Sequence, residues 1–195
     1  MRTVANNTIY AFVTSATTTG GVTIAGADAM CASAASAAGL GGSWIALLAT
    51  GTGIDGGRAS RLPWNWTTMK NMNNAVVATS FSDFTDGSWS APINRTAANA
   101  AAGSTWVWTG ASDTTGKDSY NAPSQFTCSN WTQGGNGCGY TCYGHIGAVN
   151  STTNGFNSTY DGCASSNPIY CIQDPGSALV DTDPADVTIR PGIAY

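Results

Sequence analysis

The stretch from Gly20 to Thr50 constrains the fold more than any other part of the chain, because it joins a helix of small residues directly to an apolar strand. Between Gly26 and Ala38 the apolar residues recur at helical spacing, which predicts a helix with one buried stripe that includes Cys31. A glycine-rich segment ends this helix. Trp44–Ala49 is then a continuous apolar run, as in a strand that is covered on both faces. We therefore expect an alanine-rich helix packed closely on a sheet.

The composition predicts short strands and many turns elsewhere. Only 9% of the residues are charged, against roughly 25% in ordinary soluble proteins. Glu, a common residue on exposed helix faces, is absent. A net charge of −4 argues against nucleic acid or heparin as a partner, because both need clustered Lys and Arg. The sequence contains no apolar run of 18 residues, so we expect no membrane insertion.

Six cysteines in a chain of this composition predict three disulfides and an exported, extracellular or cell-surface protein. Scattered buried thiols in a cytosolic protein are the alternative. No export signal is visible at Met1–Thr3, so we expect a piece of a longer exported chain.

Three further segments read as strands, namely Thr8–Thr14, Trp106–Gly110 and Pro168–Gln173. With the helix they predict an α+β fold in one domain over residues 1–173. Residues 174–195, with three prolines and four Asp, form a tail that packs on the domain or on a neighbouring subunit. Its cluster Asp181–Asp186 lacks the glycine and the terminal Glu of an EF-hand calcium loop, so we expect no metal and no cofactor there.

Several motifs follow one another in an order and spacing that is similar to the endostatin domain of collagens XV and XVIII and its bacterial surface relatives. The similarity runs from about Gly20 to Gln173 and is carried by Gly26, Ala27, Asp28, Cys31, Trp108, Gly110, Cys128, Trp131, Cys163 and Cys171. The resemblance implies a C-type-lectin-like fold, with a mixed twisted sheet, one or two helices and long loops.

The resemblance also implies which cysteines pair. The family's nested disulfides become Cys31–Cys171 and Cys128–Cys163, and Cys138 and Cys142 would then pair locally. The first of these would join the buried helix face to the inward face of the last strand. The family's basic heparin face and its histidine-rich zinc site are missing here, and so is the calcium signature of sugar-binding C-type lectins.

Catalysis is not expected. His145 is the only histidine and reads as structural, and no nucleophile-elbow motif accompanies it. Asp83 and Asp86 have the residue type of a glycosidase pair, but beside Gly87 and Ser88 they read as turn formers.

The main candidate for binding is aromatic. Three tryptophans fall in loops beside polar side chains, an arrangement suited to stacking on neutral sugars. The candidate residues are Trp64, Asn65, Trp66, Asp83, Asp86, Trp89 and Asn94. The alternative is that these tryptophans fill a core that is poor in Leu and Phe. A second cluster would comprise Tyr140, Tyr143 and Tyr160, whereas we assign Trp44, Trp106, Trp108 and Trp131 to the core.

Together these features predict a non-enzymatic extracellular recognition module, a bacterial surface adhesin or fibre tip that binds glycan or protein on another cell. The weakly charged surface and the tail would suit a homotrimer. A stalk domain without a ligand and a glycosidase that uses Asp83 and Asp86 are the alternatives.

Overall fold

The computed structural model describes residues 8–50, 66–114, 126–135, 137 and 142–174. Within these ranges the chain forms three helices and eight strands, which confirms the α+β class. The helices are α1 (Ile24–Ala37), α2 (Phe81–Phe84) and α3 (Cys128–Trp131). The strands are β1 (Thr8–Val13), β2 (Ser43–Ala46), β3 (Thr68–Asn71), β4 (Val76–Ala78), β5 (Trp106–Trp108), β6 (Tyr143–Ala148), β7 (Thr159–Gly162) and β8 (Tyr170–Asp174). No helix in these ranges is long and apolar enough to cross a bilayer.

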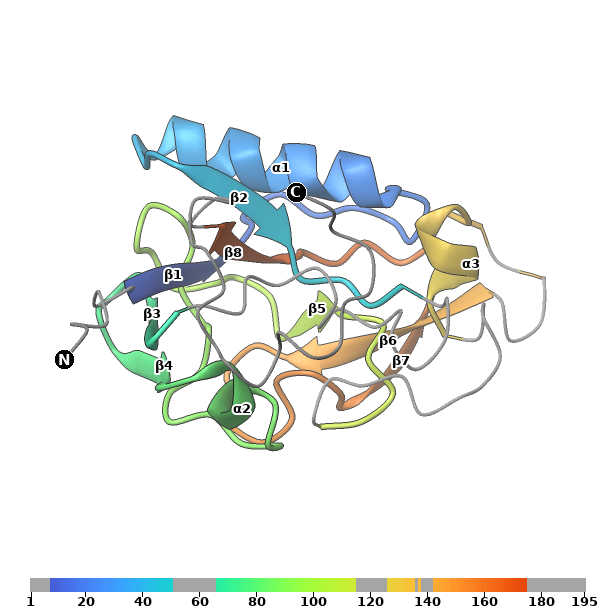
Figure 1. Ribbon diagram of the computed structural model, residues 1–195. Coiled ribbons are helices and arrows are strands. Elements are labelled where there is room, and N and C mark those ends of the chain that lie inside the picture. The colour runs from blue at the N-terminus through green and yellow to red at the C-terminus, as the bar shows by residue number, and fades with distance from the viewer. Residues whose placement is uncertain (1–7, 51–65, 115–125, 136, 138–141, 175–195) are drawn as a thin grey trace, which may run out of the picture.

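The larger sheet has five strands in the order β2-β8-β1-β3-β4. It is mixed, since β1 and β3 run parallel while the other neighbours run antiparallel. The last strand therefore lies between two early ones, and Cys171 of β8 pairs with Phe12 on one side and Ala46 on the other (Figure 1). The predicted strands at 8–14 and 168–173 are confirmed, and the one at 44–49 is confirmed over its first half.

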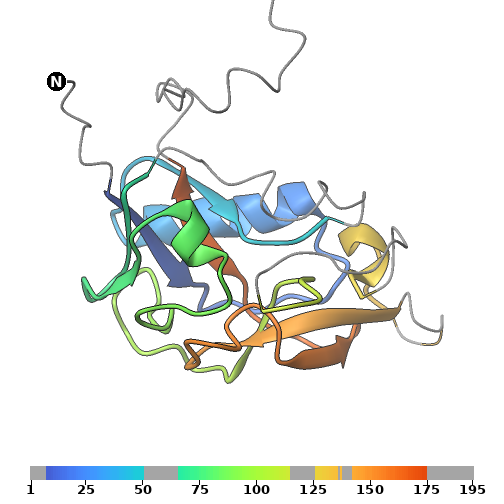
Figure 2. The ribbon, with the colours of Figure 1, turned by 60° about the horizontal axis from the view of Figure 1, so that its bottom comes forward.

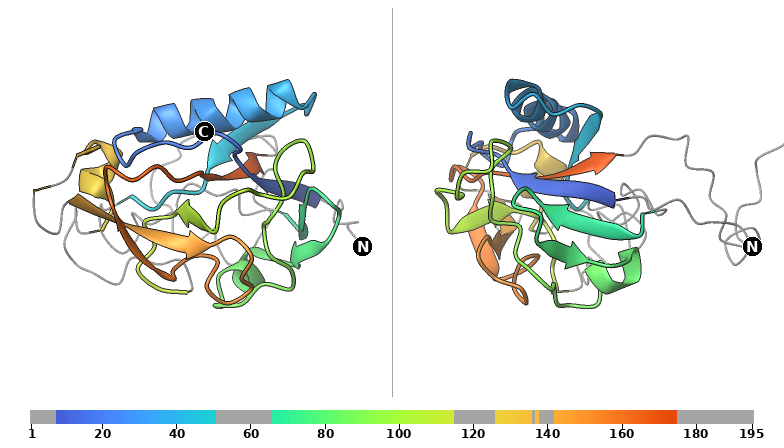
Figure 3. Two further views of the ribbon diagram at one scale, coloured as in Figure 1. Left: turned by 180° about the vertical axis from the view of Figure 1, so that it is seen from behind. Right: turned by 90° about the vertical axis from the view of Figure 1, so that its left-hand side faces the viewer.

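Helix α1 lies along one face of this sheet, over β2 and β8 (Figure 3). Its predicted span is confirmed within two residues, and Ala27, Cys31 and Ala35 form its buried stripe. Thr23 caps its first turn by accepting a hydrogen bond from the backbone N–H of Gly26. Small side chains allow the helix to approach so closely that an Asp28 oxygen accepts a hydrogen bond from the backbone N–H of Ala46 at 2.8 Å.

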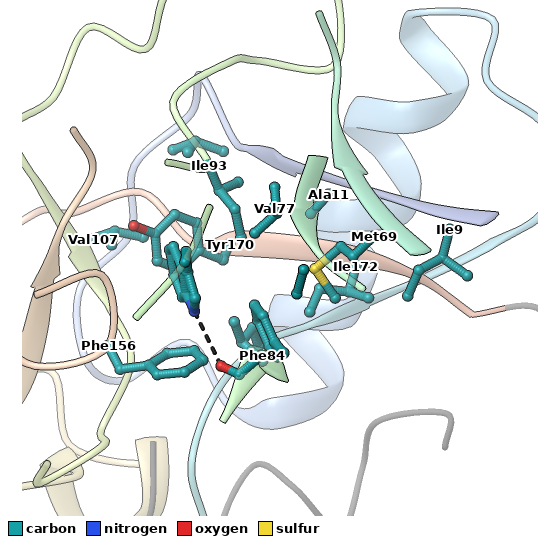
Figure 4. Close-up of a cluster of buried hydrophobic side chains, with 14 of the residues drawn as sticks. Ile9, Ala11, Met69, Val77, Phe84, Ile93, Val107, Phe156, Tyr170 and Ile172 are labelled. Atoms are coloured by element: carbon teal, nitrogen blue, oxygen red, sulfur yellow. Dashed lines mark hydrogen bonds between the residues drawn. The ribbon is translucent and has the colours of Figure 1, made fainter. Parts of the chain in front are cut away.

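The core consists of two clusters on opposite faces of the larger sheet. Because side chains alternate along a strand, Ile9, Ala11 and Val13 of β1 join one cluster and Phe12 joins the other. The first cluster surrounds Phe84, Phe156 and Tyr170 (Figure 4). The second lies beneath α1. Ile169 and Cys171 both belong to the second cluster.

A three-stranded antiparallel sheet, in the order β5-β6-β7, lies on the side away from α1 (Figure 2). Its strand β5 agrees with the predicted strand at 106–110. Strand β7 was not predicted, because the sequence Thr-Tyr-Asp-Gly has no apolar alternation.

Both disulfides that the resemblance implied within the described ranges are present, Cys31–Cys171 and Cys128–Cys163. The first closes a loop of 140 residues. Cys142 is also disulfide-bonded, and Cys138, its expected partner, lies outside the described residues. The disulfides indicate an oxidising environment, as expected for an extracellular protein.

Helix α3 has left-handed backbone geometry. Its four residues have φ between +51° and +62°, although none is glycine. The turn places Cys128 against Gly20, where any Cβ atom would collide with the Cys128 sulfur, and Trp131 against Gly110. The indole of Trp131 also donates a hydrogen bond to the carbonyl oxygen of Ala49. These contacts and the disulfide hold a conformation that non-glycine residues rarely adopt.

Candidate functional site

Trp66 and Trp89, two of the three candidate tryptophans, are buried. Their exposed fractions are 3% and 5%, so the expectation that their rings face solvent is wrong. The Trp89 indole lies among aromatic partners, stacked on Phe84 and edge-on to Phe156, with centroids 5.3 and 4.7 Å away. Trp66 packs edge-on against the same Phe84. Both side chains fill the core, as the alternative interpretation of the sequence held.

Of the two acidic candidates, Asp83 lies in the short helix α2 and Asp86 in the bend that follows it. An Asp83 oxygen accepts hydrogen bonds from the backbone N–H and the hydroxyl of Thr79, at 2.6 and 2.8 Å. An Asp86 oxygen accepts a hydrogen bond from the backbone N–H of Ser88 at 2.9 Å. The turn-forming interpretation is thus confirmed for Asp86, whereas Asp83 belongs to α2 and holds Thr79, just before that helix begins.

Of the three remaining candidates, only Asn94 belongs to the described residues. It is half-buried, and its carbonyl oxygen accepts a hydrogen bond from the backbone N–H of Ala102. Trp64 and Asn65 lie outside the described residues. Because Trp66 and Trp89 are buried, the five described candidates do not form one exposed surface.

Three large apolar side chains of the described ranges are exposed. These are Trp106 at 37%, Tyr143 at 39% and Tyr160 at 54%. The assignment of Trp106 to the core is wrong, because β5 is an edge strand and its first residue faces outward. The two tyrosines belong to the second aromatic cluster that the sequence suggested, whereas Tyr140 lies outside the described residues.

Tyr143 and Tyr160 meet on one face of the smaller sheet. The register of β6 and β7 places His145 opposite Tyr160 and Tyr143 opposite Gly162. Since residues two apart on a strand share a face, the two tyrosines and His145 lie on the same side. The tyrosine rings are 5.3 Å apart and nearly perpendicular, at 81°. We call Phe126, Tyr143, His145 and Tyr160 the aromatic face.

Phe126 supports this face. Its ring lies 5.4 Å from Tyr160 and 4.8 Å from His145. Its carbonyl oxygen accepts a hydrogen bond from the backbone N–H of His145 at 2.8 Å, which fixes the segment before α3 against β6. The Tyr160 ring therefore contacts aromatic neighbours on two sides and still exposes half of its surface.

Covalent links lie next to the aromatic face in the chain. Cys142, which directly precedes Tyr143, is disulfide-bonded. On the neighbouring strand, Gly162 lies opposite Tyr143 and is followed by Cys163, which is bonded to Cys128. The backbone N–H of Cys163 donates a hydrogen bond to the Cys142 carbonyl oxygen at 2.7 Å. The ends of β6 and β7 are thus fixed to each other and to α3, so the two tyrosines have a rigid base.

The aromatic face carries no carboxylate and no Lys or Arg. Asp161, next to Tyr160, points to the opposite side of β7, as strand alternation requires. There its oxygens accept hydrogen bonds from Ser165 at 2.8 Å and Asn167 at 3.0 Å. The four residues of the aromatic face can thus offer a ligand flat rings and phenolic hydroxyls, but no carboxylate, ammonium or guanidinium group.

No group of three or more His, Cys, Asp or Glu that could hold a metal ion occurs within the described part of the chain. Comparison with known proteins assigns no family: no protein-family model matches this chain, and no curated protein sequence matches it. The similarity to endostatin-like domains therefore rests on the motifs given above.

Proposed function

We propose that this domain is a non-enzymatic recognition module of an extracellular protein, with an endostatin-like, C-type-lectin-like fold. It acts as a bacterial surface adhesin or fibre tip that holds glycan or protein on another cell. One observation carries the proposal, namely the exposed pair of Tyr143 and Tyr160 on a rigid base. Exposed aromatic side chains that are already ordered lose little conformational freedom on binding, and they are enriched where proteins bind ligands.

The arrangement of the disulfides supports this role. Cys31–Cys171 ties the helix to the middle of the larger sheet, and Cys128–Cys163 ties α3 to the end of β7. A module exposed to the extracellular medium benefits from such links, because they stabilise the fold where no chaperone is present.

A binding experiment tests the proposal. Fluorescently labelled domain is added to a panel of host and bacterial cells, and bound label is measured by flow cytometry. We expect saturable binding that falls at least tenfold in the double variant Tyr143→Ala/Tyr160→Ala. Trp106→Ala is the matched control, because Trp106 is another exposed aromatic residue, at the opposite end of β6 and on its other face.

A stalk domain without a ligand is the competing function. It predicts no saturable binding to any cell, and an aromatic face that becomes buried between subunits. Light scattering and crosslinking distinguish the two, because a homotrimer that buries Tyr160 would dissociate in the Tyr160→Ala variant. Exposed tyrosines in a soluble trimer or monomer favour the recognition module.

A further inference from the structure

We infer that the aromatic face binds a neutral sugar ring, with the pyranose C–H surface stacked on Tyr160 and its edge against Tyr143. This inference rests on the proposed function and names the ligand class of the same surface. The shape of the face is the first argument. The two rings meet edge to face at 81°, with centroids 5.3 Å apart, and form a corner in which both rings are partly exposed. A pyranose has one flat C–H surface and a narrow edge, and it can contact both rings of such a corner at once.

The residue opposite Tyr143 keeps that corner open. In the register of β6 and β7 this position is Gly162, which has no side chain to cover the Tyr143 ring from the neighbouring strand. On the other side of the pair, Phe126 packs against Tyr160 and prevents the ring from folding away from the surface. The corner thus exists before a ligand arrives, which lowers the entropic cost of binding.

The size of the face favours a small ligand over a protein surface. An aromatic side chain has roughly 200 Å² of surface, so exposed fractions of 39% and 54% leave the tyrosines with on the order of 200 Å² together. A stable protein–protein interface needs about 800 Å² per partner. Among the described residues, the exposed aromatic area therefore matches one or two sugar rings.

The charge of the face favours a neutral sugar over an acidic one. Sialic acid and sulfated sugars are held by Arg or Lys, and the aromatic face has neither. The protein carries a net charge of −4, and Asp161, which adjoins Tyr160 in the chain, is hydrogen-bonded on the other side of β7. The phenolic hydroxyls can donate and accept hydrogen bonds with sugar hydroxyls without any charge.

A pair of substitutions at Tyr160 tests the inference. Tyr160→Phe keeps the flat ring, whereas Tyr160→Leu keeps apolar bulk against Phe126 and removes the flat face. The probes are methyl glycosides of glucose, galactose, mannose and N-acetylglucosamine and their β-linked disaccharides, with sialyllactose as the acidic comparison. Binding is measured by chemical-shift titration of the folded domain, and thermal unfolding confirms that each variant is folded.

We expect saturable binding of at least one neutral probe, with shifts centred on Tyr143, Tyr160 and Gly162. Affinity falls about tenfold or more in Tyr160→Leu, stays within about threefold in Tyr160→Phe, and is unchanged in Trp106→Ala. Sialyllactose binds more weakly than lactose.

The inference is overturned if no neutral probe binds, or if Tyr160→Leu binds as the unaltered domain does. If the domain still binds cells and neutral sugars neither bind nor compete, the sugar assignment fails and the recognition module stands. If it binds no cell, no surface protein and no sugar, the proposed function fails as well.

Discussion

The indole nitrogen of Trp89 donates a hydrogen bond to the carbonyl oxygen of Phe84 at 3.1 Å, while the two rings lie stacked, 9° from parallel. The N–H of the Trp89 indole is therefore hydrogen-bonded, and its ring is packed against another ring within the core. A side chain held in this way is a structural element of the loop that contains α2, and it leaves no ring face for a ligand.

Replacing Trp89 by Ala is expected to destabilise the domain by about 3–5 kcal/mol, because it leaves a large cavity beside Phe84 and Phe156. Replacing the exposed Trp106 by Ala should cost less than about 1 kcal/mol. Urea denaturation followed by circular dichroism measures both values. Equal effects for the two substitutions would contradict the burial described here.

The two described disulfides should contribute unequally to stability. In the loop-entropy model the Cys31–Cys171 bridge, which spans 140 residues, contributes about 5 kcal/mol. The Cys128–Cys163 bridge spans 35 residues and contributes about 4 kcal/mol. Paired Cys→Ala variants and urea denaturation give the comparison. Peptide mapping of the unreduced protein checks the pairing itself, and a peptide that links Cys31 to any cysteine other than Cys171 would refute the fold.

Gly20 should tolerate no side chain. A Cβ atom at this position meets the Cys128 sulfur, and the Cys163 Cβ atom lies 3.1 Å away, so neither can yield without moving the disulfide. Gly20→Ala is expected to cost about 1–3 kcal/mol or more through overpacking. Gly103→Ala is the matched control, because an added Cβ atom there meets nothing within 4 Å. Similar unfolding temperatures for the two variants would count against the close approach of Gly20 and Cys128.

Tyr170 should make the domain sensitive to alkaline conditions. Complete burial raises the pKa of its phenol far above the ordinary value of 10.0. The unfolded chain therefore loses this proton near pH 10 while the folded chain retains it. Stability is fully present below that pH and falls as the pH rises above it, by about 1.4 kcal/mol per pH unit.

Tyr170→Phe removes this proton and should remove that share of the slope. Urea denaturation at several values between pH 8 and pH 11 measures the difference between the two proteins. Parallel stability curves over this range would show that the Tyr170 phenol is accessible to water.

Local patterns sufficed for some elements and failed for others. The spacing of Ala27, Cys31 and Ala35 predicted α1, because a helix on a sheet must bury a stripe at that period. The resemblance to endostatin-like domains then predicted both described disulfides. Strand β7 has no such pattern, since it is a short edge strand whose first two residues are exposed. The sequence suggested that Tyr143 and Tyr160 belong to one cluster, but without β7 it could not show how the two rings meet.

The tryptophans show why exposure is harder to predict than secondary structure. Trp89 has polar neighbours in sequence and is buried, whereas Trp106 starts an apolar strand and is exposed. The difference arises from distant partners, namely Phe156 beside Trp89 and the sheet edge beside Trp106. Which distant residues become partners depends on how the strands pair, and the residues next to a tryptophan in the sequence do not reveal that pairing.

Strand β8 is the last described element of the chain, yet it lies between β1 and β2. Residues 170–174 must therefore be synthesised before the centre of the larger sheet can be assembled, and before Cys31 can bond to Cys171. Assembly of the larger sheet and formation of the Cys31–Cys171 disulfide are therefore coupled, and both wait for β8.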